Sequence, residues 1–148
     1  MTDMIRVKVG VTQDEITLAE GRAADDDLRL EVDDGEIVLE ERTMTWEHAD
    51  VILRLYRLLL AFVEAHHLGD VFFDGRRYLL KQSGQEIVRA RMPDLSYLRA
   101  GRISENFDRR GDFPGAPDLA VEVASPGQSR PKLLRKISDL LFYQWGFN

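Results

Sequence analysis

The chain has 148 residues, which is enough for a single domain, 1–148, with a hydrophobic core of ordinary size. Apolar residues make up 44% of the chain and charged residues 31%, as in globular proteins. Cysteine is absent, which excludes disulfides and thiolate metal sites. There is also no apolar run of about 18 residues and no basic-then-apolar leader, so we expect a cytoplasmic protein without a membrane span.

The formal net charge is −6, and it is unevenly distributed. Residues 1–50 carry 15 acidic and 5 basic side chains, whereas residues 51–148 carry 11 acidic and 15 basic ones. The acidic total argues weakly against broad affinity for nucleic acid. The basic excess of the second part is compatible with a surface that meets phosphate, and most charges of the first part are expected to lie in solvent.

A helix and a hairpin are predicted first. Thr12 and Glu15 form a capping-box pattern, which predicts a short helix over 13–20. Apolar and polar residues alternate over 28–32 and 36–40 on either side of an Asp-Asp-Gly turn. This alternation predicts a β-hairpin in which glycine supplies a positive φ.

A long helix and several strands follow. Thr45 can cap a helix over 46–67, whose apolar residues recur at helical spacing and should face a sheet. Short apolar runs bounded by Gly, Pro or Asp predict strands, and a Gly- and Arg-rich segment predicts a loop over 99–116. The element order predicts an α+β, or mixed α/β, fold. The remaining expected elements are a final helix from about 129 and strands over 71–73, 77–81, 87–91, 94–98 and 119–124. The strands over 87–91 and 94–98 either pair with each other or form one strand that bends at Pro93.

Two carboxylates stand out in the predicted strands. Glu122 lies in the middle of an apolar run, where a carboxylate is costly to bury without a cation or a hydrogen-bond donor. Asp94 follows a proline at the start of another apolar run, and Asp118 has the same context. If the two strands pair, Asp94 and Glu122 come within reach of one Mg²⁺ or Mn²⁺ ion. For Asp118 the favoured interpretation is a residue that begins a strand.

Cationic partners for these carboxylates are few. The chain has four lysines, and Lys132 and Lys136 lie one helical turn apart after the acidic strand. Lys136 borders the expected apolar stripe of the final helix, and from there it can reach back toward the carboxylates. A position on a solvated helix face is an equal alternative for Lys136 and the favoured one for Lys132. His48, near the start of the long helix, is more typical of a structural histidine than of a catalytic one.

Several motifs together suggest a family. The most specific is Pro117-Asp118-Leu119-Ala120-Val121-Glu122-Val123-Ala124-Ser125-Pro126, followed by Lys136. Weaker matches are residues 30–36, His48, residues 68–69 and residues 91–95. With these motifs the sequence resembles the Uma2 family, also called DUF820, in the PD-(D/E)XK restriction-endonuclease-like superfamily.

The resemblance implies a restriction-endonuclease-like core, in which a mixed β-sheet is flanked by helices and the active site lies at one sheet edge. It implies that Asp94 and Glu122 bind the metal ion. The superfamily lysine, expected two residues after the glutamate, is replaced by Ala124. Lys136 matches the lysine that takes its place on the following helix in Uma2-like sequences, and Glu31 matches a further acidic residue.

The end of the chain departs from the family pattern. Relatives continue past the final helix into another strand, whereas residues 141–148 no longer follow that pattern. We therefore expect a domain that is shortened at its C-terminus and lacks the last strand. An uncovered sheet edge would favour a homodimer.

Two functions of different classes follow from these observations. The first is a Mg²⁺- or Mn²⁺-dependent endonuclease that hydrolyses phosphodiester bonds of DNA, with Asp94, Glu122 and Lys136 as its catalytic residues. The second is a non-catalytic nuclease-like module that acts by self-association or partner binding. The missing lysine at Ala124 and the acidic charge balance favour the second. A weaker third option is a binder of an acidic small molecule at the Arg-rich loop over 99–110.

Overall fold

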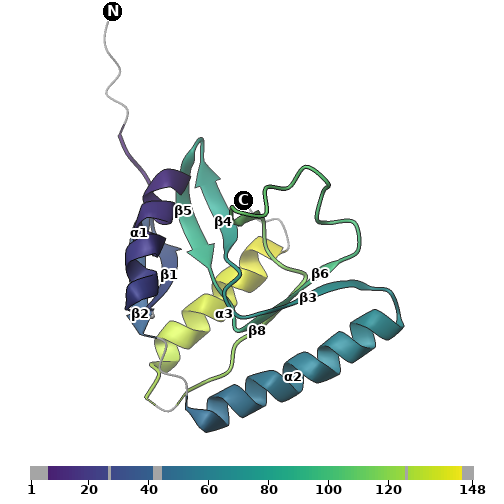
Figure 1. Ribbon diagram of the computed structural model, residues 1–148. Helices are drawn as coiled ribbons and strands as arrows, with labels where there is room; N and C mark the ends of the chain where they lie inside the picture. Colours follow the sequence, from purple (N-terminus) through teal and green to yellow (C-terminus); the bar gives the residue numbers. More distant parts are fainter. Residues whose placement is uncertain (1–6, 27, 42–44, 126, 145–148) are drawn as a thin grey trace, which may run out of the picture.

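The computed structural model of the chain describes residues 7–26, 28–41, 45–125 and 127–144 (Figure 1). Three helices and eight strands lie within these ranges. The helices are α1 (Gln13–Asp25), α2 (Trp46–Ala65) and α3 (Arg130–Gln144). The strands are β1 (Leu28–Asp33), β2 (Glu36–Glu41), β3 (Gly69–Phe73), β4 (Tyr78–Ser83), β5 (Glu86–Arg91), β6 (Leu95–Arg99), β7 (Phe113–Pro114) and β8 (Leu119–Val121).

The described strands form two sheets. One has five strands in the order β2-β1-β5-β4-β7, and the other has three in the order β3-β6-β8. Pairing is antiparallel except between β4 and β7, which run parallel. The predicted α+β fold, with a mixed sheet flanked by helices, is confirmed.

Helix α1 covers one face of the five-stranded sheet. Its N-terminus has the predicted capping box, in which Thr12 and Glu15 each accept a hydrogen bond from the other's backbone amide. Ile16 is buried against Leu30 and Val32 of β1. Because side chains alternate along a strand, Arg29 and the other odd-numbered residues of β1 project from the opposite face, toward α3.

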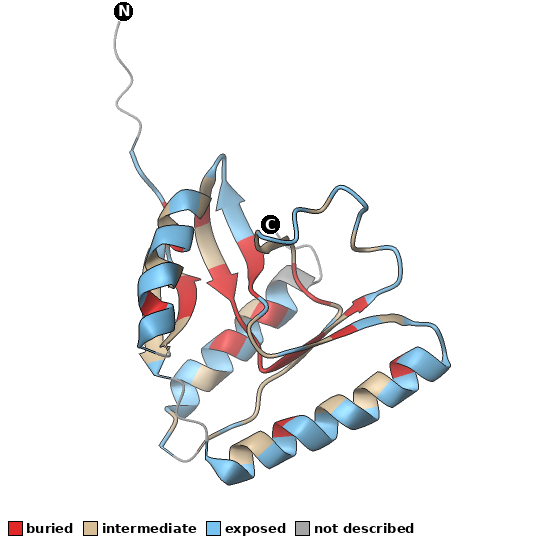
Figure 2. Ribbon diagram, viewed as in Figure 1, coloured by how far each residue is buried: buried red, intermediate tan, exposed pale blue. Residues whose placement is uncertain are grey.

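A second apolar cluster joins the two sheets to α3. It contains Tyr78, Leu80, Leu98, Ala116 and Leu140, all buried. The Tyr78 hydroxyl of β4 donates to Ser96 Oγ of β6 at 2.6 Å, which links the sheets through a buried hydrogen bond. Figure 2 shows the buried segments mostly in the strands, both between α1 and α3 and in the crossing strands β3 and β6 above α2, whereas the outer helix surfaces are exposed.

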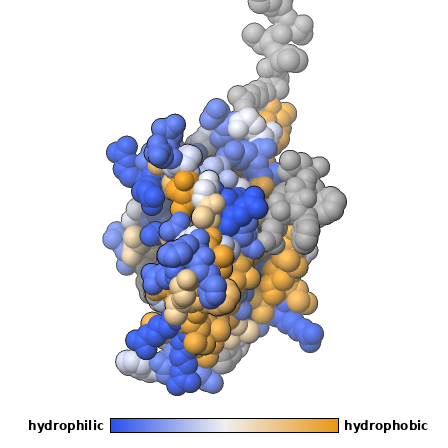
Figure 3. All heavy atoms as spheres, turned by 90° about the vertical axis from the view of Figure 1, so that its right-hand side faces the viewer, coloured by the Kyte–Doolittle hydropathy of each residue, from blue (hydrophilic) through white to orange (hydrophobic). Residues whose placement is uncertain are grey.

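Helix α2 packs by one side only. Ile52 and Val63 are buried, and Tyr56 contacts Phe73 of β3 edge to face with ring centroids 5.5 Å apart. The predicted packing of this helix on a sheet is thus confirmed for one face. Beside this packed face Leu58 and Phe62 are 71% and 56% exposed. Figure 3 shows hydrophobic side chains in the lower part of the molecular face, where α2 lies in Figure 1.

Several element boundaries differ from the sequence-based expectation. Helix α1 continues to Asp25, because buried Ala23 extends its packed face. Strands β5 and β6 are neither paired nor continuous, since the chain crosses between the two sheets at Pro93, which has no N–H to offer a ladder. The predicted loop over 99–116 contains β7, whose Phe113 amide donates to the Arg77 carbonyl at 3.1 Å.

The end of the chain bears on two further expectations. Within the described residues β8 is an edge strand of its sheet, and Leu119 is 42% exposed there. Residues 145–148, on which part of the predicted departure from the family pattern falls, lie outside the described residues. No helix in the described ranges is long and apolar enough to cross a membrane.

Candidate active site

The pairing of β6 with β8 brings Asp94 and Glu122 together. Leu95 lies opposite Val121 in the antiparallel ladder, so the same register places Asp94 opposite Glu122 just beyond it. Both carboxylates are buried, and each side chain is 4% exposed. The two strands are therefore neighbours, which meets the condition on which the shared metal site of Asp94 and Glu122 depends.

The expectation that Glu122 lies within a strand is wrong. Strand β8 ends at Val121, one residue earlier. The reason is local, because the Val123 amide donates to Asp94 Oδ2 at 2.7 Å rather than to a strand carbonyl. This bond ends the ladder and fixes the orientation of the Asp94 carboxylate.

Arg29 of β1 is the cation nearest to this pair. Its Nη2 donates to Asp94 Oδ1 at 2.8 Å, and its Nη1 lies 4.0 Å from Glu122 Oε2. Its Nη2 also lies 3.5 Å from Asp74 Oδ1, at the end of β3. Burial lowers the pKa of this guanidinium, but the surrounding carboxylates outweigh it and raise the pKa above its usual value. Arg29 was not among the site residues expected from the sequence, although strand alternation places it on the same face of β1 as Glu31.

Glu122 is the least compensated carboxylate of the site. Burial, and then the charge of Asp94, raise its pKa to about 8, whereas Arg29 and Lys136 act in the opposite direction. Its Oε1 atom is buried and has no hydrogen-bond partner among the described residues. A buried carboxyl group with an unused oxygen is the arrangement expected where a further cation can bind.

Lys136 lies in the same cavity but pairs with other carboxylates. Its Nζ donates to Glu40 Oε2 at 2.8 Å and lies 3.3 Å from Glu31 Oε2. Burial would lower its pKa, but Glu31, Glu40 and Glu122 raise it above the usual value, so the side chain is a buried ammonium ion. The predicted position at the border of the apolar stripe is wrong, because Lys136 is 1% exposed while Ile137 is 36% exposed.

Glu31 is the centre of a saturated ion-pair network. Its Oε1 accepts from the Met92 amide and its Oε2 from Arg91 Nη1, both at 3.1 Å. Arg91 in turn donates to Asp139 Oδ2 of α3 at 2.6 Å. With Lys136 also in contact, Glu31 has partners for both oxygens although it is 0% exposed. Glu31 therefore anchors α3 to β1 beside the site.

His48 and Ser125 complete the wall of the cavity. The Thr45 side chain caps α2 by accepting from the His48 amide at 3.1 Å, which sets the helix start against the site. His48 Nδ1 lies 2.9 Å from Ser125 Oγ, and Nε2 lies 3.9 Å from Asp94 Oδ2. From the sequence, His48 was expected to be structural rather than catalytic. Its place among the family-like motifs was the available signal that it belongs near the site.

The cavity has a volume of 540 Å³, and the side chains described above that line it are Arg29, Glu40, His48, Asp74, Asp94, Glu122, Ser125 and Lys136. Lys132 lies at its rim, 54% exposed, with Nζ 3.0 Å from Glu40 Oε1. Asp118 is outside it and accepts from the Arg99 amide at 2.8 Å and from Arg102 at 3.2 Å. This agrees with the interpretation of Asp118 as a residue that begins a strand.

The donor set fits one hard divalent ion with few protein ligands. No group of three or more His, Cys, Asp and Glu side chains suited to hold a metal occurs within the described ranges. Mg²⁺ often binds through one or two carboxylates and completes its shell with water and substrate phosphate. Asp94 and Glu122 supply two carboxylates, and Glu122 Oε1 is an oxygen without a protein partner in the described part of the chain.

Comparisons with known proteins agree with the resemblance seen in the sequence. The model of the Uma2 family, described as "putative restriction endonuclease", matches residues 16–139. A solved structure, of a putative nuclease belonging to DUF820 from Anabaena variabilis, is similar in fold, with a TM-score of 0.58 and 22% sequence identity. The alignment covers 76% of this chain and 59% of that chain, so this chain spans about three fifths of the neighbour's length. A search of curated proteins found no match.

Proposed function

Because this chain belongs to the Uma2 family, we propose that it is a Mg²⁺- or Mn²⁺-dependent endonuclease that hydrolyses DNA phosphodiester bonds. The observation that carries the proposal is the buried pair of Asp94 and Glu122, in which Glu122 keeps an oxygen without a partner among the described residues. In this proposal the two carboxylates hold the ion. When bound, the ion supplies Lewis-acid polarisation of a phosphoryl oxygen and activation of water.

The residues of the site have separable tasks in this proposal. Glu122, whose pKa burial and Asp94 raise to about 8, would hold the ion together with Asp94 in its ionised form. The Val123 amide keeps Asp94 aimed into the cavity. Arg29 is close enough to both carboxylates to turn a donor toward a substrate phosphate, where its planar fork suits phosphate oxygens.

Lys136 takes the part of the lysine that the sequence lacks at Ala124. It is a buried ammonium ion in the wall of the same cavity, and Glu122 is among the charges that raise its pKa. Its two close ion pairs hold it toward Glu31 and Glu40. We therefore assign Lys136 the stabilisation of negative charge at the site rather than direct proton transfer. Lys132, at the rim, contributes attraction for DNA phosphates.

The test is cleavage of supercoiled plasmid DNA by the purified chain with Mg²⁺, with Mn²⁺ and with EDTA. We expect cleavage only with a divalent ion, and a loss of at least 100-fold in Asp94→Asn and Glu122→Gln. Asp118→Asn is the matched control and should cleave like the wild type, because Asp118 is outside the cavity. Cleavage that persists in Glu122→Gln would show that the site has been assigned wrongly.

The second candidate function is a non-catalytic module that acts by self-association as a homodimer. The observation in its favour is the exposed apolar side of α2, where Leu58 and Phe62 are 71% and 56% exposed. Light scattering after size-exclusion chromatography tests this function. A dimer that Leu58→Glu converts to a monomer, in a protein that binds no Mn²⁺ by calorimetry, would favour the module over the nuclease.

A further inference from the structure

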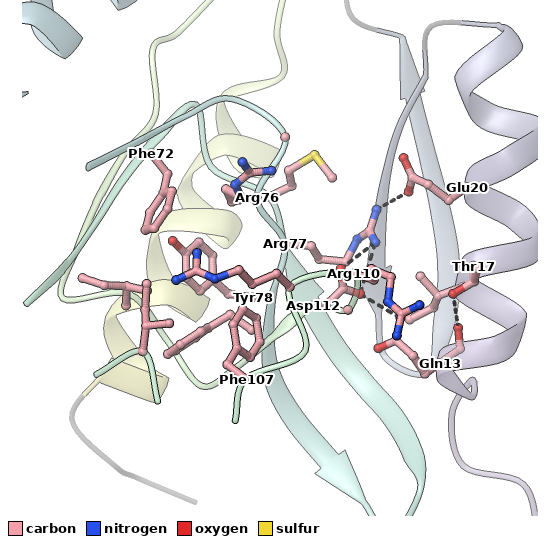
Figure 4. A pocket seen from close by; sticks show the side chains of 18 of the residues that line it. Gln13, Thr17, Glu20, Phe72, Arg76, Arg77, Tyr78, Phe107, Arg110 and Asp112 are labelled. Atoms are coloured by element: carbon pink, nitrogen blue, oxygen red, sulfur yellow. Dashed lines mark hydrogen bonds and ion pairs between the residues drawn. The ribbon is translucent and has the colours of Figure 1, made fainter. Parts of the chain in front are cut away.

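A second cavity lies on the other side of the β3–β4 connection from the acidic site. It is formed by α1, the start of β4 and the segment 100–112, and its volume is 540 Å³. This is within the range of about 300 to 1,000 Å³ that is typical of small-molecule sites. We call it the arginine–aromatic cavity. Its labelled side chains come from α1, β3, the β3–β4 connection, β4 and the segment before β7 (Figure 4).

Aromatic rings form one wall of the arginine–aromatic cavity. Tyr78 is buried beneath Phe113, with ring centroids 5.8 Å apart, and Phe107 contacts Phe113 at 5.5 Å. Phe72 also lines the cavity, and Phe72, Phe107 and Phe113 are each only partly buried. The Arg102 guanidinium lies over the Phe113 ring, 5.4 Å from its centroid, so the uncovered surface of Phe72 and Phe107 is the part suited to a planar ligand that stacks.

The charged side chains of the arginine–aromatic cavity leave a positive excess. Arg77 is neutralised by ion pairs to Glu20 and to Asp112, the latter at 3.1 Å. Arg110 pairs with Asp108 at 3.3 Å, outside the lining. Arg76 and Arg109 also line the cavity, are exposed, and form no ion pair with a described residue.

The position of Arg76 relates the charge to the aromatic wall. Its guanidinium lies over the Phe72 ring, 5.8 Å from the centroid. A ligand that stacks on the uncovered rings would therefore have a cationic group beside it. A combination of aromatic faces and arginines is the one by which proteins hold single nucleotides of nucleic acids.

We propose that the arginine–aromatic cavity binds a nucleotide unit, with its base against Phe72 and Phe107 and its phosphate at Arg76 and Arg109. The unit can come from a free mononucleotide or from an unpaired nucleotide of a DNA strand. The binding does not depend on cleavage at the acidic site and goes beyond the proposed nuclease function. The two cavities share a turn, because Asp74 lines the acidic site and Gly75 and Arg76 line this cavity.

The test is calorimetric titration in EDTA with dAMP, with inorganic phosphate, with deoxyadenosine and with a six-nucleotide single strand. The expected result is that dAMP or the single strand binds at least tenfold more tightly than phosphate or deoxyadenosine. Arg76→Gln combined with Arg109→Gln should weaken that binding at least tenfold. Arg130→Gln, which alters an exposed arginine on α3, is the matched control and should bind like the wild type.

The outcomes separate the two sources and the two proposals. Binding of dAMP that the double variant loses supports a free nucleotide, and binding of the single strand alone, lost in the same variant, supports a nucleotide within a strand. No binding of either, or binding that the double variant keeps, overturns the inference. Glu122→Gln should bind as the wild type does, so a failed cleavage test leaves this result intact.

Discussion

Two groups of buried carboxylates lie next to each other on the α3 side of β1, and they differ in the positive charge that they meet. Glu31 has partners for both oxygens, including Arg91 and Lys136. Glu122 has a guanidinium 4.0 Å away and one oxygen without a partner in the described part of the chain. We call Glu31 with Glu40 the saturated group, which joins α3 to the sheet, and Asp94 with Glu122 the undersaturated group. In the undersaturated group the pKa of Glu122 is raised, as is typical of functional sites.

The largest expected effect is a loss of stability caused by a substitution in the saturated group. Lys136→Met removes the buried ammonium ion between Glu31 and Glu40, so that Glu31 keeps only Arg91 and Glu40 only the exposed Lys132 as cationic partners. Removing one partner of a buried ion pair costs about 3 to 5 kcal/mol. We expect a loss of this size in the free energy of unfolding, measured by urea denaturation at pH 7. Lys132→Met is the matched control, because Lys132 is 54% exposed and its pair with Glu40 should contribute less than about 1 kcal/mol. Equal losses in the two variants would contradict the comparison.

A smaller effect of opposite sign is expected at the undersaturated group. The pKa of Glu122 is about 8 in the folded protein, against an ordinary value of 4.5. Between these values the unfolded chain releases a proton that the folded protein keeps, so stability falls as the pH rises through this window. Glu122→Gln removes this ionisation and should be more stable than the wild type at pH 8, by less than the roughly 4 kcal/mol to which the whole shift corresponds.

The measurement for Glu122→Gln is a set of thermal unfolding curves from pH 5 to pH 8 in EDTA. The variant should have a flatter dependence of the melting temperature on pH than the wild type. It should also lose Mn²⁺ binding in a calorimetric titration, so a gain of stability would accompany a loss of function. Parallel curves for the two proteins would mean that Glu122 is compensated as fully as Glu31.

The smallest effect is expected at Asp118, which shares the Pro-Asp context of Asp94. Its carboxylate is 26% exposed and pairs with Arg102 on the surface side of β8. Asp118→Asn should therefore change the free energy of unfolding by less than about 1 kcal/mol. Mn²⁺ titration of this variant should match the wild type. A loss of Mn²⁺ binding in Asp118→Asn would show that a carboxylate outside the cavity also takes part in holding the ion.

Local sequence signals predicted the elements of the site better than their partners. The hairpin pattern placed Glu31 correctly on β1, and the two Pro-Asp motifs preceded strands that do pair. The separation of β5 from β6 into different sheets was not predictable from Pro93. Because proline has no N–H it can end the hydrogen-bonded ladder of a strand, but it does not determine which sheet the next strand joins.

The partners of Lys136 were outside the reach of pattern analysis. Helical spacing indicates which side of α3 the lysine shares with Leu140, but Glu40 lies 96 positions earlier in the chain. Arg29 was missed for the same reason, since its contact with Asp94 depends on how the hairpin is placed beside β6. Both contacts follow from tertiary packing, which a local period of 2 or 3.6 residues does not encode.

Arg29 is a tethered counter-ion for the carboxylates that we propose as metal ligands. An entering metal ion would displace the guanidinium from the carboxylates. Its net binding free energy is therefore the difference between the attraction of the carboxylates for the ion and their attraction for Arg29. A monovalent ion carries no more charge than the guanidinium and gains little by the exchange, whereas a divalent ion can outcompete it. Arg29 would also neutralise Asp94 after a metal ion has been removed, so chelation should empty the site without unfolding the domain.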